Sequence, residues 1–333
     1  MLLTCRTPLR VSLFGGGTDY PSYFERKAGA VIGFAINKYI YTSALPLGAY
    51  VDYKFRLSYS RIELVEASRD IEHPVVRALL PHYGYDRPTD FSIQADLPAS
   101  AGLGSSSAFT VGFINLVSAL KNIPRTKIEL AQEAIMVEQE LLKENVGIQD
   151  QLHAAFGGLN RFNFSGDRID IKPIKITGAA LRELTDSMIL VFTGVKRRAT
   201  AIVDEQIKNT AAKQVDNELA AMMALLEEAE TVLEKPENHR VEDLAKLLHE
   251  SWLIKRRLSS KITSDEIDEL YEYCLSKGAL GGKLCGAGGG GFLLMVVPPE
   301  RRASFTEQVG DRRCIAFSVD CQGSQIINSI SSQ

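Results

Sequence analysis

The sequence predicts an α+β fold with two domains. Short β-branched and aromatic runs dominate the first half, longer helical patterns dominate the second, and the two do not alternate as in a doubly wound sheet. The chain has 333 residues, and at about 150 residues per domain this corresponds to two domains. With 45% hydrophobic and 24% charged residues, each domain can bury a core. We place the domains at residues 1–180 and 181–333.

In the first half, strand patterns come before helical ones. Apolar residues on nearly all sides of 108–120 predict a buried helix, and an apolar stripe over 128–142 after a helix-start signal predicts another. A turn signal at 165–167 predicts a hairpin between strands at 159–164 and 169–176. Period-two alternation and β-branched runs predict the remaining strands at 10–14, 31–37, 39–45, 55–59 and 91–97.

The second half contains mainly helical patterns with a few strands. Apolar spacing predicts one long helix that ends before Pro236, because proline cannot continue a helix. Glycines concentrate between residues 281 and 291. The expected elements are a strand at 188–192, helices at 222–233, 244–252 and 265–276, and strands at 292–297 and 314–319.

Charge and cysteine content exclude several classes of protein. The net charge of -3 gives no basic field for nucleic acid or an anionic membrane, and the apolar runs are too short to span a bilayer. The N-terminus lacks the features of a signal peptide. The cysteines are odd in number, five, without CxxC spacing, which indicates free thiols. We expect a cytoplasmic protein that acts on a small molecule, and a homodimer is an open alternative.

A glycine-serine segment before the 108–120 helix predicts a phosphate-binding loop. Glycines followed by serines at a helix start expose backbone N–H groups, and the helix dipole adds positive charge there. The alternative is an ordinary serine N-cap, but one serine would suffice for that. The segment is no Walker A motif, because no lysine follows the last glycine. The candidate residues are Gly102, Leu103, Gly104, Ser105, Ser106 and Ser107.

Two other glycine clusters lie near the ends of the chain. At residues 10–20, Arg10 precedes a glycine turn and Asp19 follows it, so the two could face one pocket, although Asp19 could also be an Asx-turn residue. At residues 284–292, four consecutive glycines form either a flexible hairpin or a loop whose backbone lies against a ligand or the phosphate loop.

Two carboxylates could complete a phosphoryl-transfer site. Glu138 lies on the stripe that otherwise looks buried, where a carboxylate needs a partner or a metal, although it could also lie at the stripe's edge. Asp150 follows that helix. Two carboxylates and a phosphate loop are the components of Mg²⁺-assisted phosphoryl transfer.

Basic triplets occur twice, at residues 196–198 and 255–257. Such a triplet is usually a solvated surface. Arg197, Arg198, Lys255 or Arg256 could instead bind a second anionic group on the substrate.

Together, the motifs resemble those of the GHMP small-molecule kinases, in the family's order along the chain: RVSLFGGGTDY, LPASAGLGSSSA and KLCGAGGGGF. The resemblance covers essentially the whole chain. It implies an N-terminal domain like the second domain of ribosomal protein S5, a ferredoxin-like C-terminal domain, and a site between them that uses ATP and Mg²⁺.

The family pattern also implies roles for individual residues. The segment GIQDQ places the catalytic aspartate at Asp150, with Arg10 beside it. The Mg²⁺ ligands fall on Ser106 and Glu138, and the sugar-binding aspartate falls on Asp19. Galactokinases carry Glu-His where this chain has two glycines, which puts galactose in doubt. The candidate substrate-binding residues are Gly16, Gly17, Thr18, Asp19, Arg198, Lys255, Arg256, Gly288 and Gly289.

One branch of the family matches the non-catalytic segments as well. FTGVKRRAT, HESWLIKRRLS and GALGGKLCGAGGGGF resemble the D-glycero-D-manno-heptose 7-phosphate kinases, which phosphorylate the anomeric hydroxyl for nucleotide-activated heptose and surface glycan synthesis. A phosphorylated substrate would explain the basic triplets. The alternatives are a kinase of an unphosphorylated sugar such as L-fucose or galactose, a mevalonate-type kinase, and a non-catalytic sugar-sensing relative.

Overall fold

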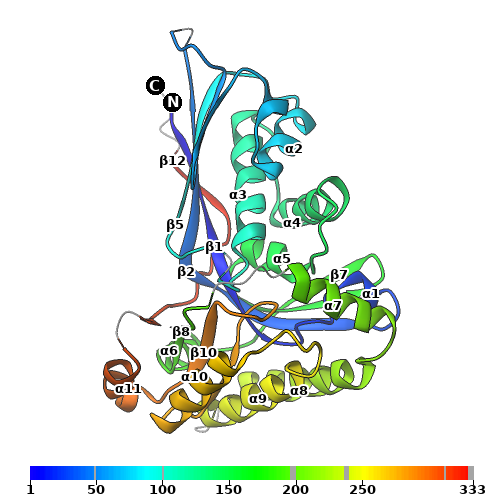
Figure 1. The fold of residues 1–333 in the computed structure, drawn as a ribbon, viewed down its shortest axis with the longest axis vertical. Helices are drawn as coiled ribbons and strands as arrows, with labels where there is room; N and C mark the ends of the chain where they lie inside the picture. The colour runs from blue at the N-terminus through cyan, green and yellow to red at the C-terminus, as the bar shows by residue number, and fades with distance from the viewer. Residues whose placement is uncertain (49, 100, 196–199, 236–239, 311–312, 329–333) are drawn as a thin grey trace.

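The structure is a computed structural model that describes residues 1–48, 50–99, 101–195, 200–235, 240–310 and 313–328. These residues form two lobes, an upper one around an eight-stranded sheet and a lower one around a four-stranded sheet (Figure 1). Both sheets are almost entirely antiparallel and neither is a doubly wound parallel sheet, which confirms the predicted α+β class.

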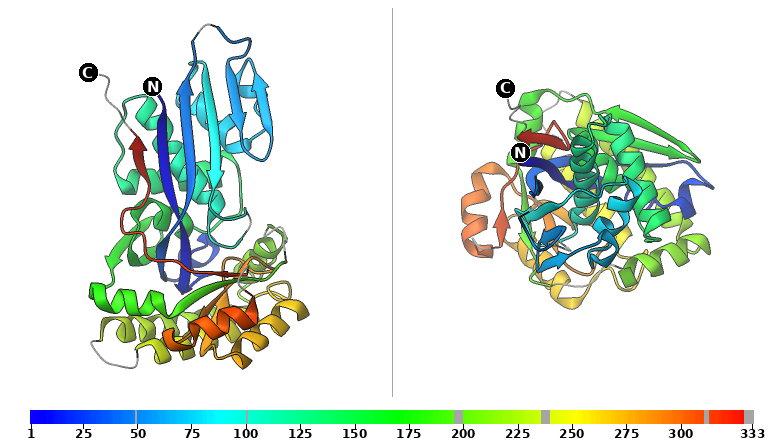
Figure 2. Two further views of the ribbon diagram at one scale, coloured as in Figure 1. Left: turned by 90° about the vertical axis from the view of Figure 1, so that its left-hand side faces the viewer. Right: turned by 90° about the horizontal axis from the view of Figure 1, so that it is seen from above.

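The upper sheet stands nearly upright above the helices of the lower lobe (Figure 2). Its strands are antiparallel apart from the β3–β5 pair. The main path runs β12-β1-β2-β5-β3-β4, with β6 pairing with β2 and β7. The strands are β1 (Leu3–Phe14), β2 (Gly29–Pro46), β3 (Phe55–Ser58), β4 (Ile62–Val65), β5 (Thr89–Ala95), β6 (Leu159–Ser165), β7 (Arg168–Pro173) and β12 (Gln325–Asn328).

Strand β2 corrects one expectation, because it is continuous where the sequence predicted two strands. Its first part pairs with β6 and its second part with β5, while β1 runs along both. The register with β1 shifts between Pro8 and Leu9, close to the change of partner. One continuous strand therefore contains both predicted segments, and each segment pairs with a different neighbouring strand.

Helices cover one face of the upper sheet (Figure 1). The central α3 packs against β1 and β2 and is buried along most of its length. The predicted helix start before α4 is confirmed, because Thr126 and Glu129 form a reciprocal capping box. The elements are α1 (Pro21–Phe24), η1 (Ser68–Asp70), α2 (Pro74–His82), α3 (Ser105–Leu120), α4 (Lys127–Met136), η2 (Val137–Leu141) and α5 (Gln149–Phe156).

The end of the predicted 128–142 helix differs from expectation. Here η2 is a turn of π-helix, wider than an α-turn. Glu138 lies in this turn and is only 1% exposed. The carboxylate is therefore buried rather than at the edge of the stripe.

The lower lobe surrounds a sheet of order β11-β8-β10-β9. Its strand pairs are all antiparallel, and the predicted strand 188–192 and helix 265–276 have the expected bounds. The elements are α6 (Gly178–Asp186), β8 (Met188–Phe192), α7 (Thr200–Ala211), α8 (Asp216–Glu234), α9 (Arg240–Lys255), α10 (Asp265–Ser276), β9 (Gly281–Leu284), β10 (Phe292–Val296), η3 (Pro299–Arg301), α11 (Arg302–Val309) and β11 (Cys314–Ile315).

The C-terminal segment returns to the upper lobe. The predicted strand 314–319 is wrong in length, because only Cys314 and Ile315 pair with β8. Val319 instead forms a bridge with Ile36 of β2, and β12 then pairs with β1. The domain boundary near residue 180 stays a prediction. It did not include the return of the C-terminal segment to the upper lobe.

Within the described ranges, no helix is both long enough and apolar enough to cross a membrane.

Candidate active site

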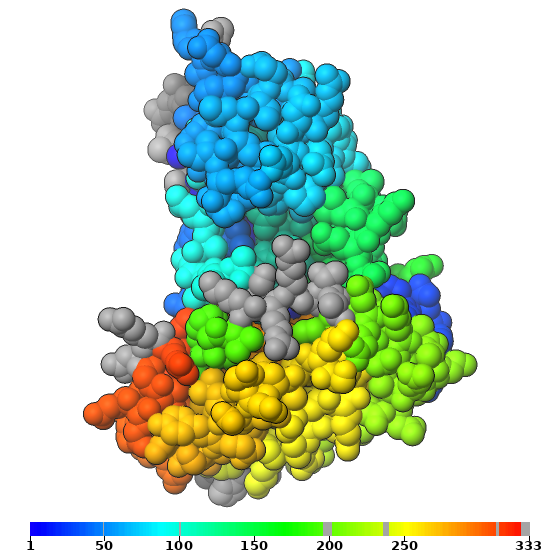
Figure 3. Space-filling model, in the orientation of Figure 1, coloured from blue at the N-terminus to red at the C-terminus, as the bar shows by residue number. Residues whose placement is uncertain are grey.

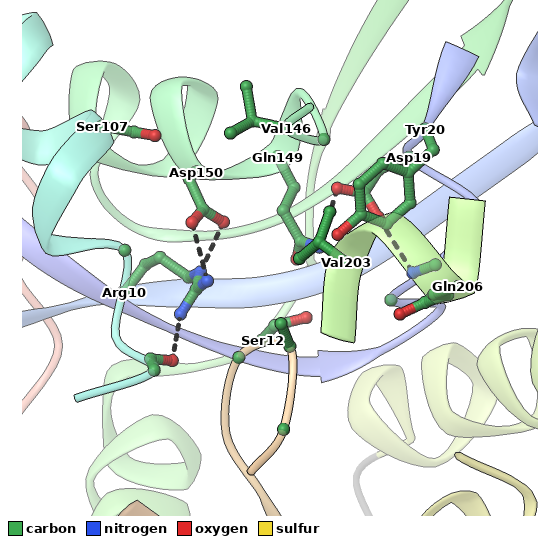
Figure 4. Close-up of a pocket in the computed structure, with 18 of the residues that line it drawn as sticks. Arg10, Ser12, Asp19, Tyr20, Ser107, Val146, Gln149, Asp150, Val203 and Gln206 are labelled. Carbon is green, nitrogen blue, oxygen red and sulfur yellow. Dashed lines mark hydrogen bonds and ion pairs between the residues drawn. The ribbon is translucent and has the colours of Figure 1, made fainter. Parts of the chain in front are cut away.

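The three glycine clusters meet in one cavity between the lobes. Figure 3 shows the two lobes that meet there, and Figure 4 shows the cavity itself. The upper lobe contributes β1, the turn after it, the start of α3 and the start of α5. The lower lobe contributes α7, α8, the end of α9, Lys283 of β9 and the glycine loop before β10.

The predicted phosphate loop is the N-terminus of α3. Its N-cap Gly104 has a φ of 72°, and no described side chain caps the helix, so first-turn N–H groups are available to an anion. Leu103 is buried, and its carbonyl accepts a hydrogen bond from the Arg10 backbone N–H at 3.0 Å. The residues of the loop that line the cavity are Gly102, Gly104, Ser105, Ser106 and Ser107.

The third glycine cluster lies against this loop. A Cβ on Gly102 would come within 2.6 Å of the Cys285 carbonyl oxygen, and one on Gly286 within 2.5 Å of the Gly102 Cα. Side chains are thus excluded where the two backbones touch. Gly288 lines the cavity, whereas the Gly289 N–H donates to the Ile262 carbonyl at 2.8 Å. Of the two alternatives for this cluster, the structure favours a loop against the phosphate loop.

Arg10 and Asp150 form the central ion pair (Figure 4). Nε and Nη2 of Arg10 donate to the two carboxylate oxygens of Asp150, each at 2.8 Å, and Nη1 donates to the Gly102 carbonyl at 2.7 Å. Burial alone would lower the pKa of Arg10, but the charge and hydrogen bonds of Asp150, together with Cys285 and Asp19, outweigh burial and raise that pKa. Asp150 lies in the first turn of α5, and its side chain is 24% exposed, so a substrate can reach it.

Glu138 lies beneath the phosphate loop. Its Oε2 accepts a hydrogen bond from Ser107 at 2.8 Å and another from Gln151 at 2.5 Å. Burial raises the pKa of Glu138 to about 7, although hydroxyls of Thr110 and Ser107 and the Gln151 amide act in the opposite direction. The family resemblance implied Ser106 and Glu138 as Mg²⁺ ligands, whereas the serine that contacts Glu138 in the structure is the next one, Ser107.

The residues around Glu138 fit a divalent cation. Its other oxygen, Oε1, forms no hydrogen bond within the described part of the chain. A buried carboxylate with an open oxygen beside a serine hydroxyl offers the hard oxygen ligands that Mg²⁺ prefers. A cation would also compensate a charge that burial otherwise disfavours.

Asp19 is held at the opposite side of the cavity from the phosphate loop. Its carboxylate accepts from the Gly17 N–H and from the Gln149 side-chain amide, both at 2.9 Å, and burial raises its pKa. Neighbouring Thr18 is fully buried, and its hydroxyl donates to the Gly15 and Ala30 carbonyls at 2.8 and 2.9 Å. Thr18 therefore supports the turn, whereas Asp19 lines the cavity.

Two buried lysines line the lower-lobe side of the cavity. Lys255 at the end of α9 donates to the Leu284 carbonyl at 2.9 Å and to the Gly286 carbonyl. Lys283 on β9 donates to the Leu13 carbonyl at 2.7 Å. Burial lowers the pKa of Lys255 to about 7 and that of Lys283 to about 8.

Only one residue of the second basic triplet belongs to the cavity wall as described. Lys255 lines it, whereas Arg256 forms an ion pair with Asp268 at 2.6 Å and lies over the Trp252 ring. Residues 196–199, with Arg197 and Arg198, lie outside the described residues.

Several residues that line the cavity were not predicted from the sequence. Lys283 stands directly before the glycine loop, and Gln149 directly before Asp150, so motif neighbours could have indicated both. Ser12 faces the cavity from β1. Gln206 lies on α7, a helix that was not expected from the sequence, and no local signal pointed to it.

Family models match both halves of the chain. The model "GHMP kinases N terminal domain" matches residues 71–158, and the model "GHMP kinases C terminal" matches residues 217–315. The first includes the phosphate loop, Glu138 and Asp150, and the second includes Lys255 and the glycine loop.

Individual relatives agree with this assignment. D-glycero-alpha-D-manno-heptose 7-phosphate kinase of Campylobacter jejuni is 30% identical over 85% of this chain and 86% of its own. Galactokinase of Thermotoga maritima is 27% identical over the same shares. The crystal structure of a D-glycero-D-manno-heptose 1-phosphate kinase from Bacteriodes thetaiotaomicron has the same fold, with a TM-score of 0.74, 22% identity and coverage of 99% of this chain and 100% of its own. The chain therefore belongs to the GHMP kinase family, and it is an ATP-dependent sugar kinase.

Proposed function

We propose that this kinase transfers phosphate from ATP to the anomeric hydroxyl of D-glycero-D-manno-heptose 7-phosphate. The product, the 1,7-bisphosphate, would enter nucleotide-activated heptose and surface glycans such as lipopolysaccharide or capsule, and the reaction would take place in the cytoplasm. The similarity to the heptose 7-phosphate kinase of Campylobacter jejuni supports this substrate. The Bacteriodes thetaiotaomicron protein of the same fold is named for a heptose 1-phosphate instead, so the two names place the existing phosphate on different carbons of the sugar.

The observation that carries the proposal is the pair of buried lysines. Lys255 and Lys283 are 7% and 2% exposed and contact backbone carbonyls. No ion pair joins either lysine to a carboxylate among the described residues. A buried, unpaired ammonium group is costly unless an anion compensates it. Two of them on one cavity wall support an acceptor that already carries a phosphate.

Asp150 and Arg10 are the residues that we expect to act on the reacting hydroxyl. The bidentate contact fixes the Asp150 carboxylate, which would orient the acceptor hydroxyl and take its proton. Arg10 also donates to the phosphate loop, so one guanidinium links the acceptor side to the nucleotide side. Positioning and charge stabilisation of this kind supply most of the catalysis in phosphoryl transfer.

Glu138, with Ser106 or Ser107, would hold Mg²⁺ beside the nucleotide phosphates. The ion supplies charge neutralisation of those phosphates when bound. The exposed N–H groups at the start of α3 would bind the same phosphates and keep the nucleotide in line with Asp150.

A panel of possible acceptors, four sugars and mevalonate, tests the proposal. ADP release would be measured with heptose 7-phosphate, unphosphorylated heptose, galactose, L-fucose and mevalonate, and phosphorus NMR would locate the new phosphate. A charge-assisted phosphate contact contributes about 1.5–3 kcal/mol. We therefore expect kcat/KM to be about tenfold to a hundredfold higher for the phosphorylated heptose.

Variants of the lysines connect that preference to the cavity. Lys255→Met and Lys283→Met keep side-chain length and remove the charge, so each should reduce the preference for the phosphorylated sugar. Lys246→Met is the matched control, because Lys246 lies on α9 like Lys255. Its side chain is 71% exposed and pairs only with Asp243, at 3.3 Å, among described residues. Equal kcat/KM for the two heptoses would contradict the proposal and favour a neutral-sugar kinase.

A further inference from the structure

We propose that Ser12 and Gln149 form a subsite for one hydroxyl of the acceptor sugar, and that Gly16 keeps this subsite open. The inference rests on the sugar kinase activity, whichever sugar is phosphorylated. It concerns a different part of the cavity wall from the two lysines.

Two polar atoms on this wall are buried without a partner. Ser12 and Gln149 are only 6% and 9% exposed. Ser12 Oγ and Gln149 Oε1 form no hydrogen bond with any residue that the structure describes. Both side chains line the cavity, and Figure 4 shows them on neighbouring elements, β1 and α5. Buried polar atoms are normally satisfied, so a ligand is the expected partner.

The hydrogen bonds within the protein determine what kind of group fits. The Gln149 Nε2 donates to Asp19 at 2.9 Å, and a carboxylate only accepts, so the Gln149 carbonyl oxygen is left as an acceptor. Ser12 can donate or accept. A sugar hydroxyl can donate to Gln149 and accept from Ser12 at the same time. A phosphate has only acceptor oxygens when ionised, so it would be repelled by the Gln149 oxygen.

Gly16 marks the position of the subsite. A Cβ built on Gly16 would lie 3.6 Å from Ser12 Oγ and 3.8 Å from Gln149 Nε2. A hydroxyl near that point is therefore close to Ser12 Oγ and to the Gln149 amide group, of which Oε1 is the atom without a partner among the described residues. A side chain at position 16 would occupy the same space.

The backbone itself does not require glycine at position 16. Its φ is not in the left-handed region, and a Cβ there meets ordinary van der Waals distances. By contrast, Gly17 has a φ of +103°, and a Cβ on it would lie 2.8 Å from Gln206 Nε2. Gly16→Ala should therefore fold normally and fill the subsite, which makes it a clean test.

The experiment measures sugar binding and turnover separately. Calorimetry without nucleotide gives the Kd of the sugar that the wild-type enzyme phosphorylates, and steady-state kinetics give KM for that sugar and for ATP. We expect Gly16→Ala and Ser12→Ala to raise the sugar Kd and KM about tenfold to a hundredfold. KM for ATP should stay within about twofold, because the two subsites are separate and their contributions should be nearly independent.

A matched control and a set of deoxy sugars identify the contact. Ser251→Ala removes another buried serine hydroxyl that has no partner among described residues and does not line the cavity, so it should leave the sugar Kd unchanged. In the wild type, one deoxy analogue should bind about tenfold or more weaker than the parent sugar. In Ser12→Ala, the same analogue should bind about as well as the parent sugar does, because the contact that it lacks is already absent.

Two results would overturn the inference. One is a normally folded Gly16→Ala protein, by circular dichroism, with unchanged sugar Kd. The other is that each deoxy analogue loses as much affinity, relative to the parent sugar, in Ser12→Ala as it does in the wild type. If the sugar panel instead shows that an unphosphorylated sugar is preferred, the heptose 7-phosphate proposal fails, and the subsite is tested on that sugar with the same variants.

Discussion

Glu138→Gln should stabilise the ligand-free protein at alkaline pH, although it removes a residue of the site. Burial raises the pKa of Glu138 to about 7 from its ordinary 4.5. The folded protein thus retains a proton that the unfolded chain gives up above pH 4.5. Between these values stability falls as pH rises, because the unfolded state binds fewer protons. Glutamine has the same shape and no charge, so it removes this penalty.

The size of the effect follows from the pKa difference. One pKa unit corresponds to about 1.36 kcal/mol, so the full penalty of ionising Glu138 is about 3 kcal/mol above pH 7. At pH 5.5 the same relation gives about 1 kcal/mol. The difference in unfolding free energy between variant and wild type should therefore grow by about 2 kcal/mol between pH 5.5 and pH 8.

Urea denaturation followed by circular dichroism measures this difference. Both proteins would be treated with EDTA to remove metal ions. The contributions of the other titrating groups to stability are the same in both proteins and cancel in the difference. Adding Mg²⁺ and nucleotide should stabilise the wild type more than the variant, because only the wild type offers a carboxylate to the ion. A difference that does not change with pH would refute the reasoning, since it would mean that Glu138 is not a buried charge in the ligand-free protein.

Three further outcomes follow from the site. Asp150→Asn should lower kcat on the order of 10²-fold or more with unchanged nucleotide affinity, measured by calorimetry beside the kinetics; near-normal kcat would remove Asp150 from the mechanism. Ser107→Ala should raise the Mg²⁺ concentration needed for half-maximal activity more than Ser106→Ala does, because Ser107 contacts the carboxylate of Glu138; the reverse order would favour Ser106 as the ligand. Gly286→Ala should lower the unfolding free energy by more than about 2 kcal/mol, because its φ is +67° and its Cβ would press on a neighbouring backbone at 2.5 Å; an unchanged urea midpoint would contradict that contact.

The glycine-rich parts of the site could be predicted from sequence because they depend on backbone shape. Glycines at 102 and 104 before serines indicate a helix start without side-chain interference, and the structure has that helix start. The run 286–291 likewise has positive φ at five positions: Gly286, Gly288, Gly289, Gly290 and Gly291. Local sequence determines such backbone conformations, so local patterns reveal them.

The polar partners were harder to predict because they depend on packing between distant elements. The 3.6-residue pattern placed Glu138 on the buried stripe, but it describes neither the π-turn in which Glu138 lies nor its contact with Ser107. The position of Lys283 before the glycine loop indicates that it is near the site, but its place beside Lys255 depends on the packing of β9 against α9. Arg256 had the same local signal as Lys255, yet it lies just after the end of α9 and pairs with Asp268.

The charges across the cavity suggest which end each substrate occupies. Glu138 lies at the upper-lobe side without a described cationic partner, and Lys255 and Lys283 lie at the lower-lobe side without a described anionic one. Arg10 and Asp150, in contrast, neutralise each other. An ion carried by the nucleotide would therefore be drawn to the α3 end, and a phosphate on the acceptor would be drawn to the lysines. Phosphoryl transfer would then occur at Asp150, which lines the cavity and is held by Arg10.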